Sequence, residues 1–370
     1  MTRETIFEAS LDYFLSPIGE FLKDDSVSEV MVNGFDEIYI ERSGKLYETD
    51  ASFRSEDELL SAVHNVAQFV GREIDENRPI MDARLPDGSR VHAVIPPSAR
   101  RGTYLTIRKF LRDIFSMDNF IERGSLSASA KEFLDLCVKL RKNIIIAGGT
   151  GTGKTSMLNA VSGAIPEEER IVIIEDSSEL QLNQKHALYL EAQQADAYGR
   201  GGVSIRELFV ASLRMRPDRI VVGEVRGGEA LDMIQSMISG HSGSMTTVHA
   251  TSPNDAMTRL ETLSLMSDVE IPMVVARAQV ASAVNIVVQL TRFVEDGSRK
   301  VTRIAEMGGL DDSGHYQFQD IFKSQLKGRT SDGQLLADLA WTGTKPSFAD
   351  EPFQHGMENQ IELTTKIWGK

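Results

Sequence analysis

The chain has 370 residues, of which 41% are hydrophobic and 25% are charged. This balance excludes wholesale disorder, and at about 150 residues per domain the length fits two or three domains. The 40 basic and 54 acidic residues give a net charge of −14, which argues against nonspecific binding to nucleic acid or anionic lipid. The single cysteine, Cys137, excludes an intramolecular disulfide and a multi-cysteine zinc site and fits a reducing compartment.

The first 110 residues have the pattern of a mixed α+β domain. Apolar side chains in residues 5–22 fall on one helical face, and Pro17 is expected to kink or divide that helix. This face fits packing against the domain better than binding to a membrane surface, because its polar side is acidic. The elements that follow are short strands over 28–50, a helix over 55–70, a hairpin that turns at Asp87 and Gly88, and a strand over 102–110.

The pattern changes after residue 110. Residues 111–126 are interpreted as a helical linker, and residues 127–327 as a second domain. Short apolar runs alternate there with helical stretches, which predicts a parallel sheet covered on both faces. The predicted strands are Asn143 to Ala147, Arg170 to Ile174, Arg219 to Val222 and Met245 to Val248. Residues 328–370 are polar and rich in turns, and we expect a small appendage or tail.

No stretch of the sequence is typical of a membrane-spanning helix. The longest mostly apolar segment, 271–290, is interrupted by polar residues such as Arg277 and Asn285, whereas a span needs about 20 nearly uncharged apolar residues. The N-terminus lacks a basic region followed by an apolar run and a cleavage site, so we expect no secretory signal. These observations predict a cytoplasmic protein.

The motif GGTGTGKT is the strongest chemical signal. It matches the pattern G-x-x-x-x-G-K-[ST], with a strand expected before it and a helix after it. The loop amides and the helix N-terminus attract phosphate, Lys154 neutralises the β- and γ-oxygens, and the Thr155 hydroxyl reaches Mg²⁺. We therefore predict binding of ATP with Mg²⁺. The predicted nucleotide contacts are Gly148, Gly149, Thr150, Gly151, Thr152, Gly153, Lys154, Thr155 and Ser156.

Three further strand ends carry polar side chains. The strand IVIIE ends in Glu175, the strand RIVV is followed by Gly223 and Glu224, and the strand MTTV is followed by His249. In open α/β sheets, ligands bind at the carboxyl ends of the strands. We expect these side chains beside the phosphate-binding loop, with Glu224 bound to Mg²⁺ directly or through water and His249 hydrogen-bonded to the γ-phosphate.

Each of these residues also has a plainer interpretation, which the sequence leaves open. The carboxylates at Glu175, Asp176 and Glu179 are also compatible with a solvated loop, and His241 and His249 with structural histidines. A metal site made by the two histidines is disfavoured, because they lie eight residues apart on no evident helix and have no cysteine partner.

The sequence resembles the secretion and traffic ATPases, which drive type II and type IV secretion and the assembly of type IV-like pili. The segments GGTGTGKT, IIEDSSEL, LRMRPDRIVVGEVRG and SGHSGSMTTVHATSPNDAMTRLETL look like the Walker A, Asp box, Walker B and His box of that superfamily. The segments EVMVNGFDEIYIE, DARLPDGSRVHAVIPP and TIRKF are similar to its Tad/Flp pilus-assembly branch, whose ATPase is called CpaF or TadA.

The resemblance implies an α/β fold with a RecA-like P-loop NTPase core, in which a mostly parallel sheet is flanked by helices, and a separate N-terminal α+β domain. It also implies a hexameric ring with an ATP site at the junction of the two domains. By the same resemblance, Glu175 is the general base, Glu224 holds Mg²⁺ or the attacking water, and His249 reads the γ-phosphate. Arg90 and Arg108 would reach the nucleotide from the N-terminal domain.

These features predict a cytoplasmic ATPase, peripheral to the inner membrane, that powers Tad/Flp pilus assembly or protein secretion through a membrane platform protein. We expect the hinge at 111–126. The alternative is a RecA-like nucleic-acid motor, but such motors present basic grooves and aromatic platforms, and only 7% of this chain is aromatic; we expect no nucleic-acid partner. A GTPase would need an Asn-Lys-x-Asp element to recognise guanine, and the sequence has none. A ring component that binds ATP without hydrolysing it would not need the carboxylates of Glu175 and Glu224.

Overall fold

The computed structural model describes residues 11–369 except 12, 43, 86, 111–115, 194, 196–198 and 331–334. The chain divides into two compact units, formed mainly by Met1–Asp113 and by Ile114–Lys370, which we call the N-terminal unit and the sheet unit. Most of the helix predicted over 5–22 and the first part of the linker predicted over 111–126 lie outside the described residues. No helix in the described part of the chain has the length and apolarity needed to cross a membrane.

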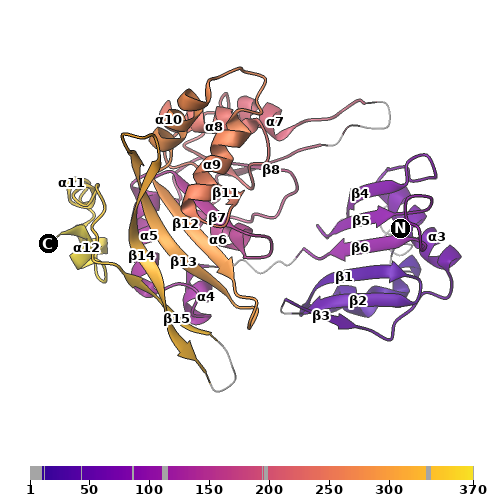
Figure 1. The fold of residues 1–370 in the computed structure, drawn as a ribbon. Coiled ribbons are helices and arrows are strands. Elements are labelled where there is room, and N and C mark those ends of the chain that lie inside the picture. The colour runs from indigo at the N-terminus through magenta and orange to yellow at the C-terminus, as the bar shows by residue number, and fades with distance from the viewer. Residues whose placement is uncertain are drawn as a thin grey trace. The chain divides into compact units, whose positions relative to one another are not determined.

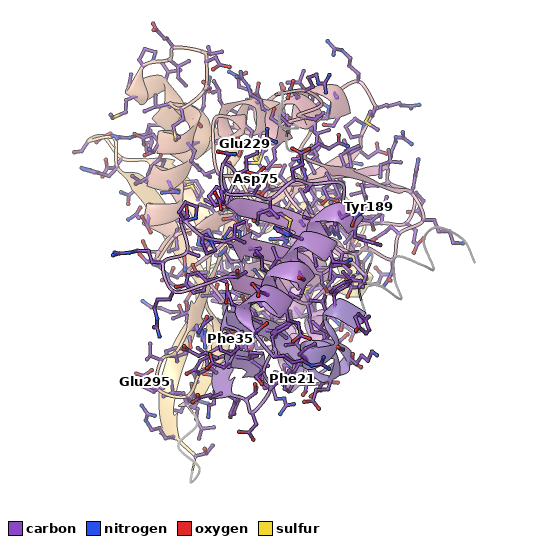
Figure 2. The ribbon with its side chains drawn as sticks, turned by 90° about the vertical axis from the view of Figure 1, so that its right-hand side faces the viewer. Phe21, Phe35, Asp75, Tyr189, Glu229 and Glu295 are labelled. Carbon is purple, nitrogen blue, oxygen red and sulfur yellow. The ribbon has the colours of Figure 1, made fainter. Side chains whose placement is uncertain are left out.

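The N-terminal unit is built on a six-stranded antiparallel sheet in the order β3-β2-β1-β6-β5-β4. Its helix α3 (Glu56–Phe69) begins at Ser55, whose side chain accepts a hydrogen bond from the amide of Glu58, and packs Leu59 and Val63 into the core. Pro17 lies in a 3-10 turn (Ser16–Ile18) that precedes α2 (Gly19–Lys23), so the predicted break is present. Figure 2 labels Phe21 and Phe35, which pack at the margin of this core. The strands are β1 Val27–Gly34, β2 Glu37–Arg42, β3 Lys45–Glu48, β4 Ile80–Arg84, β5 Arg90–Val94 and β6 Tyr104–Arg108.

The sheet unit contains a sheet of nine strands among the described residues, in the order β15-β14-β13-β12-β7-β11-β10-β8-β9. The strands from β12 to β9 run parallel, and β13, β14 and β15 extend the sheet in antiparallel fashion. The sheet is therefore mixed, with the parallel strands in the majority. The strands are β7 Ile144–Gly148, β8 Ile171–Glu175, β9 Ala187–Glu191, β10 Arg219–Val222, β11 Met245–His249, β12 Ile286–Arg292, β13 Arg299–Leu310, β14 Tyr316–Arg329 and β15 Leu335–Trp341.

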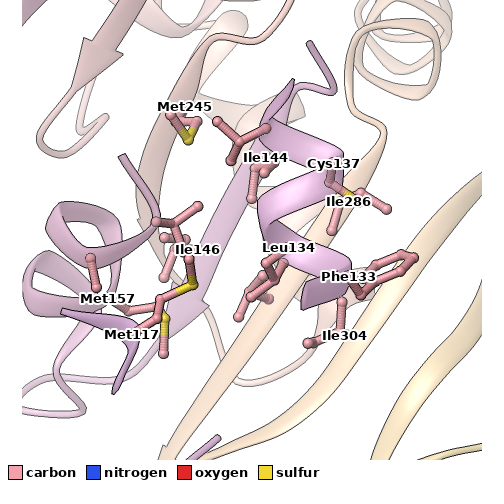
Figure 3. Close-up of a cluster of buried hydrophobic side chains, with 14 of the residues drawn as sticks. Met117, Phe133, Leu134, Cys137, Ile144, Ile146, Met157, Met245, Ile286 and Ile304 are labelled. Carbon is pink, nitrogen blue, oxygen red and sulfur yellow. The ribbon is translucent and has the colours of Figure 1, made fainter. Parts of the chain in front are cut away.

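Helices cover both faces of this sheet (Figure 1). Successive residues of β7 point to opposite faces: Ile144 and Ile146 join the core under α4 (Met117–Glu122), α5 (Ala128–Lys139) and α6 (Lys154–Ser162), which Figure 3 shows. Ile145 and Ala147 join the other core, under α7 to α10. Because both faces are buried, the strand is apolar at every position rather than at alternate ones. The helices of the second face are α7 Ile205–Ser212, α8 Glu229–Ile238, α9 Pro253–Ser264 and α10 Met273–Ala283.

Residues 328–370 differ from the polar appendage expected for them. The strand β15 extends the sheet, and Trp368 is fully buried with its ring stacked on Phe133 at a centroid distance of 5.3 Å. The carboxylate of Glu132 on α5 accepts hydrogen bonds from the backbone amides of residues 362–364. This segment is part of the sheet unit's core, because its few aromatic side chains supply enough buried area to fix a mostly polar stretch. Its short helical turns are α11 (Glu351–Gln354), η2 (Glu358–Gln360) and α12 (Thr365–Trp368).

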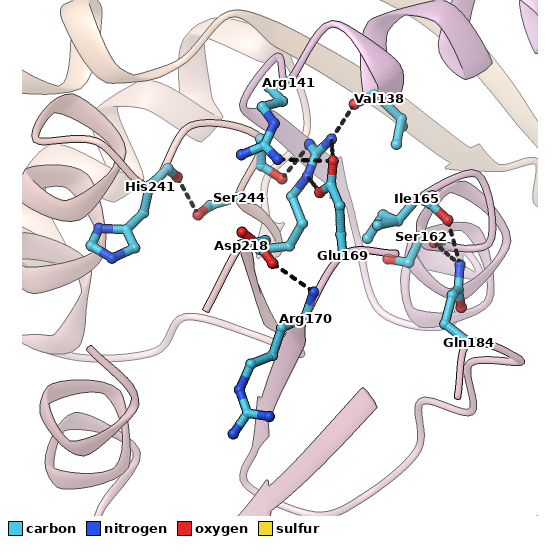
Figure 4. Close-up of polar contacts among 12 residues, drawn as sticks. Val138, Arg141, Ser162, Ile165, Glu169, Arg170, Gln184, Asp218, His241 and Ser244 are labelled. Carbon is cyan, nitrogen blue, oxygen red and sulfur yellow. Dashed lines mark hydrogen bonds and ion pairs between the residues drawn. The ribbon is translucent and has the colours of Figure 1, made fainter. Parts of the chain in front are cut away.

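The amino ends of the parallel strands are joined by buried polar contacts, several of which Figure 4 shows. Arg219 begins β10 and is fully buried. Its guanidinium pairs with Glu169 and donates to the carbonyls of Val138 (2.7 Å) and Gly243 (3.3 Å). Asn143, just before β7, accepts from the amides of Gly243 and Ser244 at 2.7 and 3.1 Å. These contacts fix the starts of β7, β10 and β11 relative to one another.

Candidate active site

The phosphate-binding loop joins β7 to α6 at the carboxyl edge of the parallel strands. Gly148 ends β7, where a Cβ would lie 2.5 Å from Thr152 Oγ1 and 3.0 Å from the carbonyl oxygen of Leu290. Gly153 has φ +88° and begins α6 without a capping side chain, so both positions need glycine. Lys154, Thr155 and Ser156 form the first turn of the helix, whose amides face the loop. The geometry of a phosphate-binding loop is thus preformed.

Lys154 and His249 meet beside this loop. Lys154 is mostly buried; its Nζ donates to the carbonyl of Gly149 at 3.0 Å and lies 3.5 Å from His249 Nδ1. His249 Nε2 lies 2.9 Å from a carboxylate oxygen of Glu224. Burial lowers the pKa of His249, and the charge of Lys154 lowers it further, while Glu224 opposes both. The neutral tautomer fits these contacts, since it donates from Nε2 to Glu224 and turns the lone pair of Nδ1 toward the lysine.

Arg226 links the carboxylates of two strand ends. Its guanidinium contacts Glu224 at 2.7 Å and Asp176 at 3.2 Å. The amides of Arg226 and Gly227 both donate to the buried carboxylate of Glu229, at 2.7 and 2.9 Å. The chain after β10 is therefore held in place by α8, and Glu224 has a fixed position between His249 and Arg226.

Glu175 ends β8 and is 4% exposed. Its Oε1 accepts hydrogen bonds from the amides of Glu179 at 2.9 Å and Leu180 at 3.0 Å. A Cβ on Gly223 would lie 2.9 Å from Glu175 Cγ, so the glycine before Glu224 makes room for this side chain. The carboxylate is buried and oriented by its own loop, which differs from the solvated loop that the sequence also allowed.

A pocket of about 460 Å³ borders the phosphate-binding loop. It is lined by loop residues including Gly149 and Thr152, by Thr251, and by residues 289–294 at the end of β12. A Cβ on Gly151 would lie 3.4 Å from Arg292 Nη1, so the Arg292 guanidinium lies beside the loop. Arg292 and Thr251 were not among the predicted site residues, although Arg292 ends the strand β12 and Thr251 lies two residues after β11. Both therefore lie at the edge where ligands bind in such sheets.

Arg90 and Arg108 belong to the N-terminal unit. They are register partners on β5 and β6, and Arg84 on β4 is the register partner of Arg90. Three arginines therefore occupy neighbouring strands at one level of this sheet. Their role at the nucleotide stays a prediction.

The model of the family described as "Type II/IV secretion system protein" matches residues 14–331. The chain belongs to this family. PtlH of Bordetella pertussis, a type IV secretion system protein, is 36% identical over 321 residues, covering 79% of this chain and 94% of PtlH. VirB11 of Bartonella henselae, another type IV secretion system protein, is 34% identical over 333 residues, covering 78% of this chain and 91% of VirB11.

Among solved structures, that of the pilus retraction motor PilT with bound ADP superposes on this chain with a TM-score of 0.55. The two sequences are 17% identical, and the match covers 84% of this chain and 82% of PilT. This likeness supports the fold. The predicted superfamily and the α/β fold with a RecA-like core and a separate N-terminal domain are thus confirmed, while the Tad/Flp branch stays a prediction.

The oxygen atoms at the phosphate-binding loop are of the kind that binds Mg²⁺. A threonine hydroxyl at Thr155 and a carboxylate at Glu224 are hard oxygen ligands, and Mg²⁺ in nucleotide sites is commonly held by few protein groups plus phosphate and water. No cluster of three or more His, Cys, Asp or Glu side chains that could hold a metal occurs in the described ranges. These residues therefore fit a Mg²⁺ ion that is coordinated partly by the protein and partly by the oxygens of a bound phosphate.

Proposed function

We propose that this secretion-family protein is an Mg²⁺-dependent ATPase that works as a motor of a type IV secretion or pilus machine, with the Tad/Flp pilus system as the specific assignment. The observation that carries this proposal is the convergence of Lys154, Glu224 and His249 at the loop edge, with Glu175 buried one strand away. The relatives named above belong to type IV secretion systems, which supports the machine class.

The phosphate-binding loop would hold the β- and γ-phosphates. Its amides and the N-terminus of α6 supply positive dipoles, and Lys154 supplies a full charge from a buried position. Mg²⁺, held by Thr155 and Glu224, would neutralise charge on the phosphate oxygens. The nucleoside would occupy the pocket beside Arg292 and Thr251, whose volume is about 460 Å³.

Glu175 is suited to the role of general base. Its Oε1 is fixed by two backbone amides, so the carboxylate has one orientation when a water attacks the γ-phosphorus in line and gives up its proton. His249 would report the γ-phosphate, because Lys154 and Glu224 contact its two ring nitrogens and any shift of either group moves the ring.

The motor function requires motion between the two units. We propose that Arg90 and Arg108 add positive charge to the phosphates from the N-terminal unit, as arginine fingers do, so that ATP and ADP favour different angles about residues 111–126. In a hexameric ring at the inner membrane, sequential closure would displace a membrane platform protein.

The variant Glu175→Gln tests the enzymatic part. We expect it to bind ATP like the wild type and to lose turnover by about a hundredfold or more, because only the proton acceptor is removed. Glu168→Gln, in an exposed turn before β8, is the matched control and should keep full activity. Turnover of Glu175→Gln within a few-fold of wild type contradicts the assignment, and stimulation of the wild type by DNA or RNA would favour a nucleic-acid motor.

A further inference from the structure

The connection between α9 and α10 presents apolar side chains to solvent at unusual density. Met266 is 62% exposed and Val274 is 71% exposed. We call this region the α9–α10 surface; its members are Leu265, Met266, Val269, Met273, Val274 and Val275. Scattered exposed apolar residues are ordinary, but six of them within residues 265–275 indicate an interaction site.

The segment that carries these side chains is held by specific contacts. The hydroxyl of Ser267 donates to the carbonyl of Val269 at 3.1 Å and accepts from the amide of the same residue at 3.3 Å. Arg206 on α7 pairs with Asp232 on α8 and with Asp268 in the segment. On α10, Arg277 pairs with the buried Glu261. The apolar side chains are thus displayed from an ordered backbone, which lowers the entropy cost of binding.

The same segment packs against the chain that leaves the active site. A Cβ on Gly228 would lie 2.7 Å from Ser267 Cα and 3.0 Å from the carbonyl oxygen of Met266. Gly228 follows Arg226 and Gly227, whose amides bind Glu229, and Arg226 in turn holds Glu224. A shift of Glu224 therefore has a short, close-packed route to the α9–α10 surface.

The charges at the surface select among occupants. Asp268 and Glu270 are exposed within it. Arg206, which pairs with Asp268, is shared with Asp232, and Arg277 pairs with Glu261, so carboxylates outnumber these two cations. Two copies that faced each other through this surface would bring Asp268 and Glu270 of both into one contact, where like charges repel. A segment with leucine-like side chains on one side and Lys or Arg on the other satisfies both the apolar and the acidic groups.

We propose that the α9–α10 surface is the docking site for a Lys/Arg-rich amphipathic segment of a partner protein. Its methionine and valine side chains adapt to an apolar helix face, and Asp268 and Glu270 meet the partner's cations. Cytoplasmic segments of membrane proteins have this basic composition. Any dependence of docking on the bound nucleotide rests on the proposed ATPase function; docking itself does not.

The test uses the full chain and two fluorescent helical peptides with the same leucines, one carrying lysines and the other glutamates. We expect the lysine peptide to bind the nucleotide-free chain at least tenfold more tightly than the glutamate peptide. The double variant Met266→Ser with Val274→Ser should weaken lysine-peptide binding by about tenfold or more. Glu270→Lys should weaken it several-fold at low salt.

Leu326→Ser is the matched control, because Leu326 on β14 is 65% exposed and lies outside this surface; it should bind like the wild type. Equal binding of the two peptides, or unchanged binding in both surface variants, would overturn the proposal. Sedimentation of the double variant adds a second criterion. If its assembly state falls below that of the wild type, the occupant is a second copy and the proposal is wrong.

Discussion

The two edges of the parallel strands hold buried charges in opposite ways. At the amino edge, Arg219 is fully enclosed and is bonded to Glu169 and two carbonyls, with Gly243 closing the space around it. At the carboxyl edge, Lys154 donates to the carbonyl of Gly149 and lies 3.5 Å from His249, and Arg226 is 55% exposed. The first edge is satisfied by the protein alone, whereas the second faces a pocket and a phosphate-binding loop.

This difference separates what stabilises the fold from what performs chemistry. A charge enclosed among protein groups cannot reach a ligand, while a charge at the edge of a phosphate-binding loop gains from a triphosphate. Glycines serve both edges, since Gly243 makes room for a guanidinium and Gly153 starts a helix at the loop. Four substitutions test this contrast between the two edges, and the first has the largest expected effect.

Replacing Arg219 by Met should destabilise the sheet unit by about 3–5 kcal/mol, because Glu169 loses its buried partner. Trp341 and Trp368, the chain's two tryptophans, lie in this unit, so urea unfolding followed by tryptophan fluorescence reports it. Arg141→Ala is the control. Arg141 pairs with the same carboxylate at 3.0 Å from a 43% exposed position and should cost about 1 kcal/mol or less. Equal effects would remove the distinction between enclosed and exposed partners.

Replacing His249 by Ala should lower ATP turnover by about a hundredfold. Losing one hydrogen-bond donor to the charged transition state typically has an effect of this size. The control is His241→Ala, four residues before the start of β11, which should keep wild-type turnover.

The pH profile sharpens this prediction. The folded pKa of His249 lies below the ordinary value of about 6.5, so between the two values the unfolded chain binds more protons. The residue's contribution to stability is therefore present above about pH 6.5 and is lost as pH falls through the folded pKa. We expect activity to fall on the acid side of 6.5 in the wild type. An identical acid limb in His249→Ala would show that another group titrates.

Replacing Gly153 by Ala should weaken ATP binding about five- to thirtyfold, because an L-residue at φ +88° costs about 1–2 kcal/mol. Gly34→Ala, in an open position at the end of β1, serves as the comparison. Calorimetric titration with ATP measures both. Unaltered affinity in Gly153→Ala would mean that the loop adopts another backbone when it binds phosphate.

Replacing Asp176 by Asn should change stability by less than about 1 kcal/mol, since both members of the Asp176–Arg226 pair are more than half exposed. Thermal unfolding measures this smallest effect. A loss comparable to that of Arg219→Met would show that the carboxyl edge also holds the fold together.

Features set by a short continuous stretch of sequence were predictable. The phosphate-binding loop is a continuous motif, and Glu175, Glu224 and His249 each follow an apolar run, so their common edge follows from the parallel sheet. Arg219 was hidden inside such a run, because its partner Glu169 is 50 residues away and nothing local marks a buried arginine. The fate of Trp368 depends on a contact with Phe133, more than 200 residues earlier, which composition alone does not reveal. Arg90 and Arg108 stay predictions because they lie in the other unit.

The most direct test of the central claim is calorimetric titration of ATP with Mg²⁺ into the wild type and Lys154→Ala. We predict saturable binding to the wild type and at least a hundredfold loss in the variant, whose thermal unfolding should otherwise match. No affinity in the wild type, or equal affinity in both proteins, would contradict a phosphate site built around this lysine.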